Sequence, residues 1–140
     1  TNLPIIIYNV PGRTSSNITA DTTVKLAKDF KNIVGVKEAS GNLEQIMTII
    51  LKKPDNFLVI SGDDALTLLH LSIGGDGVIS VVANAFPKRF STMVNSAIAG
   101  KRGLLADSPC NVLLNEPTLP SERNPDNIAS QHSTWICISA

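Results

Sequence analysis

Short apolar runs alternate along the chain with longer segments in which apolar residues recur every three or four positions. The short runs are rich in β-branched residues and lack polar alternation, which is typical of strands buried on both faces of a parallel sheet. We predict such strands over residues 4–10, 33–39, 57–61 and 78–82. The amphipathic segments between and after them predict helices over residues 20–30, 43–53, 65–73 and 85–99.

Residues at the ends of these segments support the helix boundaries. Thr19 is placed to cap the first helix, and Pro54 stops the second because proline cannot continue a helix. Gly74 and Gly100 end the third and fourth helices. Strand-helix units that repeat at intervals of roughly 20 to 25 residues predict a parallel α/β architecture, in either a barrel or an open sheet. The absence of a glycine-rich phosphate-binding motif between a strand and a helix disfavours a nucleotide-binding open sheet.

The last part of the chain has a different character. Residues 108–140 contain four prolines among Asn, Ser and Thr, with little helical or strand period. We therefore divide the chain into half of a barrel domain, residues 1–102, and a divergent, poorly ordered tail, residues 103–140. Trp135, Ile136 and Ile138 suit a short docked strand, although a disordered segment is the preferred interpretation. The abrupt change suggests a shifted or misassembled reading frame, which an intact frame in the resequenced DNA would contradict.

Charge and cysteine content narrow the functional classes. Lys plus Arg and Asp plus Glu number 12 each, so the zero net charge offers no electrostatic case for nucleic acid or an anionic membrane. The apolar runs are too short to cross a bilayer and the N-terminus lacks a signal pattern, so we expect a cytoplasmic protein. Cys110 and Cys137 are expected to be unpaired thiols, with a single bridge as the alternative. His70 is expected to pack or lie at the surface, and no metal site is expected.

Lys37 is the main candidate for chemistry, because it interrupts an apolar strand near its C-terminal end. In a barrel enzyme this end of the strands lines the active site, where a lysine amine can attack a carbonyl and form a Schiff base. Tyr8 lies near the end of the first strand and can relay protons, and Arg13, after a turn at Pro11 and Gly12, offers a planar fork for a carboxylate. Structural alternatives remain for each: a lysine that reaches solvent or pairs with its neighbour, a packed tyrosine and a solvated arginine.

The polar loop over residues 61–64 and the glycine-rich segment over residues 75–80 lie beside the last two strands. Glycines there permit close backbone approach to a ligand, and many barrels bind phosphate at this place. The acidic Asp63 and Asp64 would repel a phosphate, so ordinary turn geometry is the preferred explanation.

Four segments in order and spacing resemble the family of 4-hydroxy-tetrahydrodipicolinate synthase, also called dihydrodipicolinate synthase, among the pyruvate-dependent class I aldolases. They are Tyr-Asn-Val-Pro-Gly-Arg-Thr at 8–14, Gly-Val-Lys-Glu-Ala-Ser-Gly at 35–41, Ser-Gly-Asp-Asp at 61–64 and Gly-Val-Ile-Ser at 77–80. The resemblance implies a partial (β/α)₈ TIM barrel made of strands five to eight, the C-terminal half, and it extends to about Gly103. The other half, with paired threonines, a second tyrosine and most of the lysine-binding regulatory residues of the family, is absent from this sequence.

The resemblance also implies an activity, a lyase that condenses pyruvate with aspartate semialdehyde in the diaminopimelate route of lysine biosynthesis. Lys37 would form the imine, Tyr8 would relay protons, Arg13 would hold the carboxylate of the aldehyde, and Gly62 and Ile79 would line the pocket. The family needs no cofactor or metal and commonly forms homo-oligomers. Two alternatives remain: a related aldolase of the N-acetylneuraminate lyase or keto-deoxy sugar acid type, against which Arg13 argues, and a non-catalytic fragment with exposed strand edges.

Overall fold

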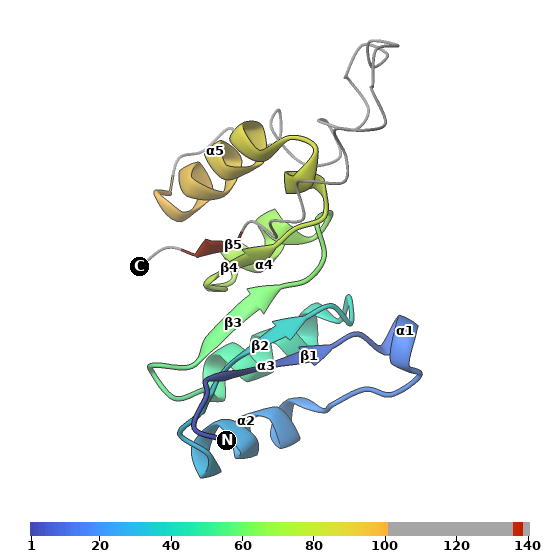
Figure 1. The fold of residues 1–140 in the computed structure, drawn as a ribbon, viewed down its shortest axis with the longest axis vertical. Coiled ribbons are helices and arrows are strands. Elements are labelled where there is room, and N and C mark those ends of the chain that lie inside the picture. Colours follow the sequence, from blue (N-terminus) through green and yellow to red (C-terminus); the bar gives the residue numbers. More distant parts are fainter. Residues whose placement is uncertain (101–135, 139–140) are drawn as a thin grey trace.

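The computed structural model describes residues 1–100 and 136–138 of the 140-residue chain. Strands and helices alternate along it, as the hydrophobic pattern predicts (Figure 1). The elements are β1 (Ile5–Asn9), α1 (Pro11–Thr14), α2 (Ala20–Asp29), β2 (Ile33–Glu38), α3 (Leu43–Lys52), β3 (Leu58–Ser61), α4 (Thr67–Ser72), β4 (Gly77–Ile79), a 3₁₀ turn η1 (Val82–Asn84), α5 (Pro87–Ile98) and β5 (Ile136–Ile138).

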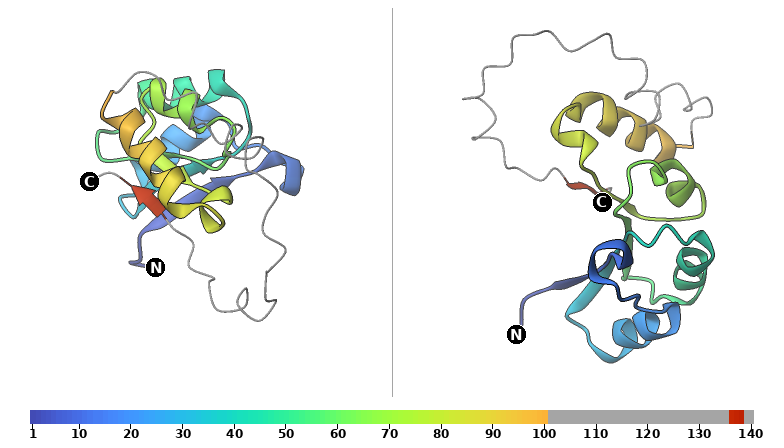
Figure 2. Two further views of the ribbon diagram at one scale, coloured as in Figure 1. Left: turned by 90° about the horizontal axis from the view of Figure 1, so that it is seen from above. Right: turned by 90° about the vertical axis from the view of Figure 1, so that its right-hand side faces the viewer.

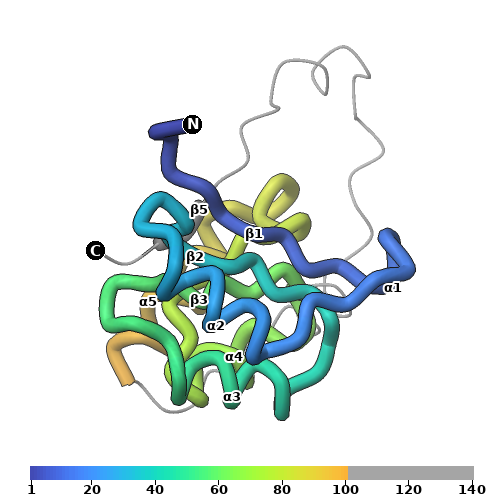
Figure 3. Tube along the Cα trace, turned by 90° about the horizontal axis from the view of Figure 1, so that it is seen from below, coloured from blue at the N-terminus to red at the C-terminus, as the bar shows by residue number. Residues whose placement is uncertain are grey.

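The strands form one sheet in the order β1-β2-β3-β4-β5. The first four pair in parallel, each with the next in sequence, and the helices that connect them lie on one side of the strands (Figure 3). This repeated strand-helix arrangement is that of part of a (β/α)₈ barrel. Strand β5 pairs antiparallel with β4, so the short docked strand at residues 136–138 is present. The other residues of the expected tail lie outside the described part of the chain.

Two apolar clusters hold the helices against the sheet. The first lies between β2, β3 and α3 and has Val36, Ile49 and Val59 fully buried at its centre. The second joins β4 to α5 through Val78, Phe90 and other buried residues of α5. Together the two clusters anchor one face of every parallel strand from β2 to β4, and this leaves the opposite face to carry the polar side chains of the site.

Helix starts follow the capping rules. The Thr19 hydroxyl accepts a hydrogen bond from the Thr22 amide at the start of α2, and the Asn42 side chain accepts one from the Gln45 amide at the start of α3. Each bond satisfies an amide that has no partner within its helix. The cap expected at Thr19 is therefore confirmed. None of the helices in the described residues is long and apolar enough to cross a membrane.

Strand β1 departs from the expectation of burial on both faces. Ile5, Ile6 and Tyr8 are 37%, 39% and 48% exposed, respectively. The physical reason is twofold: Ile6 and Tyr8 face away from the helix layer, and β1 lies at the edge of the described sheet, where only β2 pairs with it (Figure 2). Apolar character in the sequence predicted the strand correctly, but the number of its neighbours decides how much of it is buried.

Two local predictions were wrong. The segment after β1 forms the short helix α1, with Pro11 at its first position, where a turn at Pro11 and Gly12 was expected. Strand β4 ends at Ile79 and not at Val82. The Asp64 carboxylate accepts hydrogen bonds from the amides of Val81 and Val82 at 3.1 and 3.0 Å, so these amides are not available to a sheet ladder.

Candidate functional site

Lys37 and Tyr8 lie side by side on adjacent parallel strands. They are register partners, so their side chains emerge on the same face of the sheet. The Lys37 Nζ stands 4.2 Å from the centroid of the Tyr8 ring, which is a cation-π distance. The face on which they meet is opposite to the helices, because the neighbouring Val36 packs into the cluster against α3. A ligand approaching this face therefore reaches an amine and an aromatic ring together.

Gly62, the residue after β3, leaves space for the lysine. A Cβ atom at Gly62 would lie 3.0 Å from Lys37 Cε and 3.2 Å from Lys37 Cγ. The side chain of Lys37 thus runs across the backbone of Gly62 at van der Waals distance. The Gly62 amide donates a hydrogen bond to the Glu38 carbonyl at 2.8 Å, which extends the pairing of β2 and β3 beyond the strand ends. The structure therefore brings three of the five expected site residues into contact.

Arg13 and Ile79 are the other two expected site residues. Arg13 lies in α1 with an exposed side chain, at the same C-terminal end of the strands as Lys37. Ile79 is the last residue of β4 and is partly buried. Among the described residues no hydrogen bond or ion pair joins either side chain to Lys37, so their placement in one pocket stays a prediction.

A buried polar network lies directly behind Lys37 and Tyr8. Glu38 is 1% exposed, and its carboxylate accepts hydrogen bonds from the Asn9 amide nitrogen at 3.1 and 3.0 Å, the Ser40 backbone amide at 2.8 Å and the Gln45 amide nitrogen at 3.1 Å. Because all three partners donate, the carboxylate is satisfied as an acceptor. This arrangement rules out the interpretation in which Lys37 pairs with Glu38, since adjacent residues of a strand point to opposite faces.

The same network reaches the loop that follows α1, the helix that carries Arg13. Asn17 Oδ1 accepts from Asn9 at 2.9 Å, and the Ile18 amide donates to Asn9 Oδ1 at 3.2 Å. The Gln45 side chain also donates to the Ile18 carbonyl at 3.2 Å. These residues were not singled out from the sequence. The available signal was the presence of Asn9 and Glu38, two polar residues, at the ends of otherwise apolar strands.

His70 is buried and takes no part in this site. Its Nε2 lies 2.9 Å from the Val59 carbonyl oxygen, and Nδ1 has no hydrogen-bond partner among the described residues. Burial lowers the pKa of His70 below its ordinary value of 6.5, although the bond to Val59 and the carboxylates of Asp76 and Glu38 oppose the shift. The expected packed role of His70 is confirmed. The described residues contain no cluster of His, Cys, Asp and Glu able to hold a metal ion.

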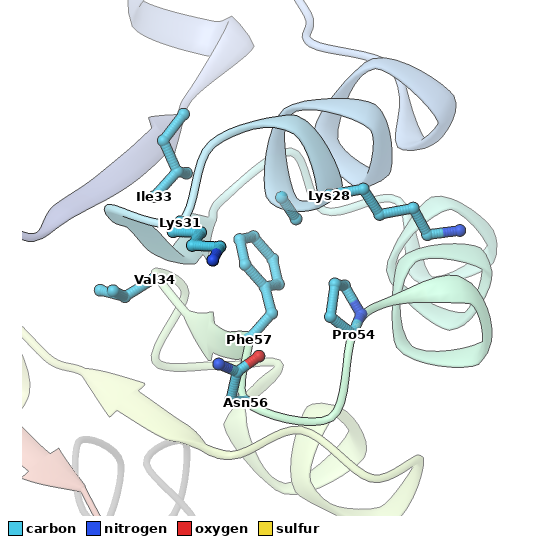
Figure 4. Close-up of a pocket in the computed structure, with 8 residues that line it drawn as sticks. Lys28, Lys31, Ile33, Val34, Pro54, Asn56 and Phe57 are labelled. Atoms are coloured by element: carbon cyan, nitrogen blue, oxygen red, sulfur yellow. The ribbon is translucent and has the colours of Figure 1, made fainter.

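A cavity of about 560 Å³ opens at the other end of the strands (Figure 4). Its walls include Lys28 and Lys31 from the end of α2 and the following loop, with Phe57 and Pro54 from the loop before β3. These residues precede the strands or lie at their N-terminal ends, whereas Lys37 lies near a C-terminal end. The cavity is therefore separate from the candidate site.

Known proteins have similar sequences and folds. The sequence model of a protein family, described as the dihydrodipicolinate synthetase family, matches residues 1–116. A 4-hydroxy-tetrahydrodipicolinate synthase of Phocaeicola vulgatus is 57% identical over 100 residues, which are 71% of this chain and 34% of the relative. The crystal structure of dihydrodipicolinate synthase from Aquifex aeolicus superposes with a TM-score of 0.70 at 42% identity, covering 72% of this chain and 34% of that one. A pyruvate complex of the enzyme from Acinetobacter baumannii gives a TM-score of 0.72 at 37% identity, with 92% and 44% covered.

These matches correct two expectations. The family match continues to residue 116, beyond the end near Gly103 that the motifs suggested. The chain spans 34% of its curated relative, about a third and not a C-terminal half, and the numbering of its strands as five to eight is not confirmed. Successive units of a (β/α)₈ barrel have the same architecture, so four consecutive strands do not by themselves reveal their position. What the fold, the site and the matches establish together is that the chain belongs to the dihydrodipicolinate synthetase family.

Proposed function

We propose that the intact protein is a Schiff-base lyase that condenses pyruvate with aspartate semialdehyde to 4-hydroxy-tetrahydrodipicolinate. The observation that carries the proposal is the placement of the Lys37 amine beside the Tyr8 ring, with Gly62 leaving room for the lysine side chain. The names of the relatives and the pyruvate complex of the Acinetobacter baumannii enzyme support the same reaction.

The chemistry begins at Lys37. Its neutral amine attacks the keto carbon of pyruvate, and loss of water leaves an imine between the lysine and the keto acid. The protonated imine withdraws electrons from the adjacent methyl group, so that a proton leaves and the resulting enamine attacks the carbonyl carbon of the aldehyde. The aldehyde oxygen takes up a proton and becomes the 4-hydroxyl group. The amino group of the semialdehyde then attacks the imine carbon, which closes the ring and releases the Lys37 amine. The imine itself is the electron sink, and the proposal therefore needs neither a metal nor an organic cofactor.

The neighbouring residues have assigned roles in this proposal. The Tyr8 hydroxyl relays protons during imine formation, and Arg13 binds the carboxylate of the aldehyde through its planar guanidinium. Gly62 lines the pocket with its backbone carbonyl group, because its amide already donates to the backbone carbonyl of Glu38. Ile79 lines the pocket from the end of β4. A cytoplasmic location, a homo-oligomeric assembly and a place in the diaminopimelate route of lysine biosynthesis are parts of the proposal that rest on the family alone.

The test is chemical trapping of the imine. The folded protein is incubated with pyruvate and borohydride, and the adduct is located by intact mass and peptide mapping. We expect reduction to fix pyruvate on Lys37 and Lys37→Ala to abolish the adduct. Lys52→Ala is the matched control, because Lys52 pairs at the surface with Asp21 and is remote in the fold from Tyr8. An adduct that survives Lys37→Ala, or no adduct in folded protein, contradicts the proposal.

Arg13 separates this reaction from that of a related aldolase. Arg13→Ala is expected to leave trapping of pyruvate unchanged and to reduce condensation with aspartate semialdehyde, because only the second substrate uses the guanidinium. An Arg13→Ala protein that condenses the semialdehyde at the original rate favours an aldolase with a sugar aldehyde as its partner.

A non-catalytic fragment is the second candidate for the 140-residue chain by itself. The exposure of Ile6 and Tyr8 on the open edge strand favours it, because such a face is covered in a closed barrel. A folded chain that traps no pyruvate, beside a full-length relative that does, identifies this case.

A further inference from the structure

The buried network around Glu38 joins β1 and β2, which carry Tyr8 and Lys37, to the loop that follows α1. Glu38 follows Lys37 directly, and its carboxylate holds Asn9, which follows Tyr8 directly. Asn9 in turn accepts a hydrogen bond from the backbone amide of Ile18, in the loop after α1, the helix that contains Arg13. Through Asn9, the Glu38 carboxylate thus connects β1, β2 and the loop after α1 behind the face on which the site lies.

The fourth connection runs to the helix layer. Gln45, in the first turn of α3, donates to Glu38 Oε2 at 3.1 Å and to the Ile18 carbonyl at 3.2 Å. Its side-chain oxygen accepts from Asn17 at 3.0 Å. Helix α3 is itself fixed by the buried Ile46 and Ile49, so the network ties the ends of two strands to a rigid element.

The composition of the network makes Glu38 its centre. Asn9, Gln45 and the Ser40 amide all direct donor groups at its two oxygens, and no Lys or Arg pairs with it among the described residues. A neutral amide at this position would place an NH₂ group against other donors and leave them unsatisfied in a buried site. The network therefore requires a side chain with two acceptor oxygens at position 38, and a carboxylate provides them.

We propose that Glu38 is a positioning residue, which holds Lys37 and Tyr8 in register for imine formation, and anchors the loop after α1, without touching the substrate. The inference rests on the proposed function for its chemical readout. It adds to that function a residue on the opposite face of the sheet, and it accounts for the fixed register of Lys37 and Tyr8 on adjacent strands.

The test compares Glu38→Gln with Asp76→Asn. Both changes turn a hydrogen-bonded carboxylate into an amide of the same shape, but Asp76 accepts from the Val59 amide and Lys53 near the start of β3, away from Lys37. At a temperature where circular dichroism shows each variant folded, we expect Glu38→Gln to slow trapping of pyruvate on Lys37 at least tenfold. Asp76→Asn should stay within twofold of the original rate, since loss of stability alone does not slow trapping in folded protein.

A polarity reversal provides the rescue. In Asn9→Asp/Glu38→Gln the new amide donates to the new carboxylate, so the bond between β1 and β2 is restored with its direction inverted. The rescue is partial, because Ser40 and Gln45 still donate toward residue 38, which then has one acceptor oxygen, and the donor to Asn17 is lost. We expect the double variant to trap pyruvate at least threefold faster than either single variant, which is the non-additivity expected of residues in contact. Equal trapping by Glu38→Gln and the original protein, equal slowing by Asp76→Asn, or strictly additive effects in the double variant would each overturn the inference.

A second readout does not depend on pyruvate. Competitive acetylation measures how accessible the Lys37 amine is beside the Tyr8 ring, and we expect its rate to rise at least threefold in Glu38→Gln and to be unchanged in Asp76→Asn. If the original protein forms no pyruvate adduct, the proposed function fails, and acetylation still decides the positioning role. An unchanged acetylation rate in Glu38→Gln contradicts that role.

Discussion

Gly62→Ala gives the most direct test of how tightly the site is packed. The added methyl group would lie 2.8 Å from Ala39 Cβ, 3.0 Å from Lys37 Cε and 3.2 Å from Lys37 Cγ. Carbon atoms in contact prefer separations of about 3.5–4.0 Å, so the lysine has to move by roughly 0.5–1 Å. Displacing a reacting group by about 1 Å can lower a rate about 100-fold, and we expect trapping to fall by about 10- to 100-fold.

The added methyl group should also lower stability. Overpacking costs about 1–3 kcal/mol; the flexible end of the lysine can move aside, but the Ala39 Cβ, the nearest atom, can move only with its backbone. Unfolding in urea measures the free energy, and borohydride trapping of pyruvate measures the rate at a temperature where the variant is folded.

Gly12→Ala is the matched control for this prediction. A Cβ at Gly12 meets nothing within 4 Å, and the helical position in α1 accepts an alanine. We expect unchanged trapping and a stability gain of up to about 1 kcal/mol. If Gly62→Ala traps pyruvate as fast as Gly12→Ala does, the contact between Gly62 and Lys37 does not position the amine.

Two further predictions concern the fold. Because burial lowers the pKa of His70 in the folded state, the unfolded chain binds more protons below about pH 6.5, and stability should fall with decreasing pH by at most about 1.4 kcal/mol per pH unit. His70→Gln, which keeps a donor for the Val59 carbonyl, should flatten this dependence in urea titrations at pH 7.5 and 5.5, and an unchanged slope would assign it to other groups. Phe90→Ala should lower the free energy of unfolding by about 3–5 kcal/mol in the same assay, because Phe90 of α5 is buried against β4. Leu51→Ala, at an exposed position, should change it by less than about 0.5 kcal/mol. Equal effects of the two changes would contradict the assignment of the core.

The local order of the chain was predictable because each element has its own signal. Continuous β-branched runs gave β1, β2 and β3, and amphipathic spacing, with a cap at Thr19 and a stop at Pro54, gave α2 and α3. The error at β4 has a different origin. Residues 78–82 suit a strand locally, but Asp64 from a preceding loop binds the amides of Val81 and Val82 and ends the strand early.

The site was predictable in part. Lys37 and Tyr8 stood out because a charged and a phenolic group near the ends of apolar strands need a reason, and the structure places them 4.2 Å apart at the ring centroid. Glu38 did not stand out, because beside Lys37 it suggested a simple ion pair. Its partners Asn9 and Gln45 are 29 and 7 residues away in sequence, and no local pattern connects them.

By itself, then, the sequence determined which segments become strands and helices, their order, and the residue types able to do chemistry. Those properties depend on backbone preferences and on the spacing of apolar side chains, which act over a few neighbouring residues. Only the tertiary structure decided that β1 is an exposed edge, that Lys37 turns to Tyr8 and away from Glu38, and that Glu38 joins three segments. These outcomes depend on contacts between residues far apart in the chain, where register and burial select one partner among many.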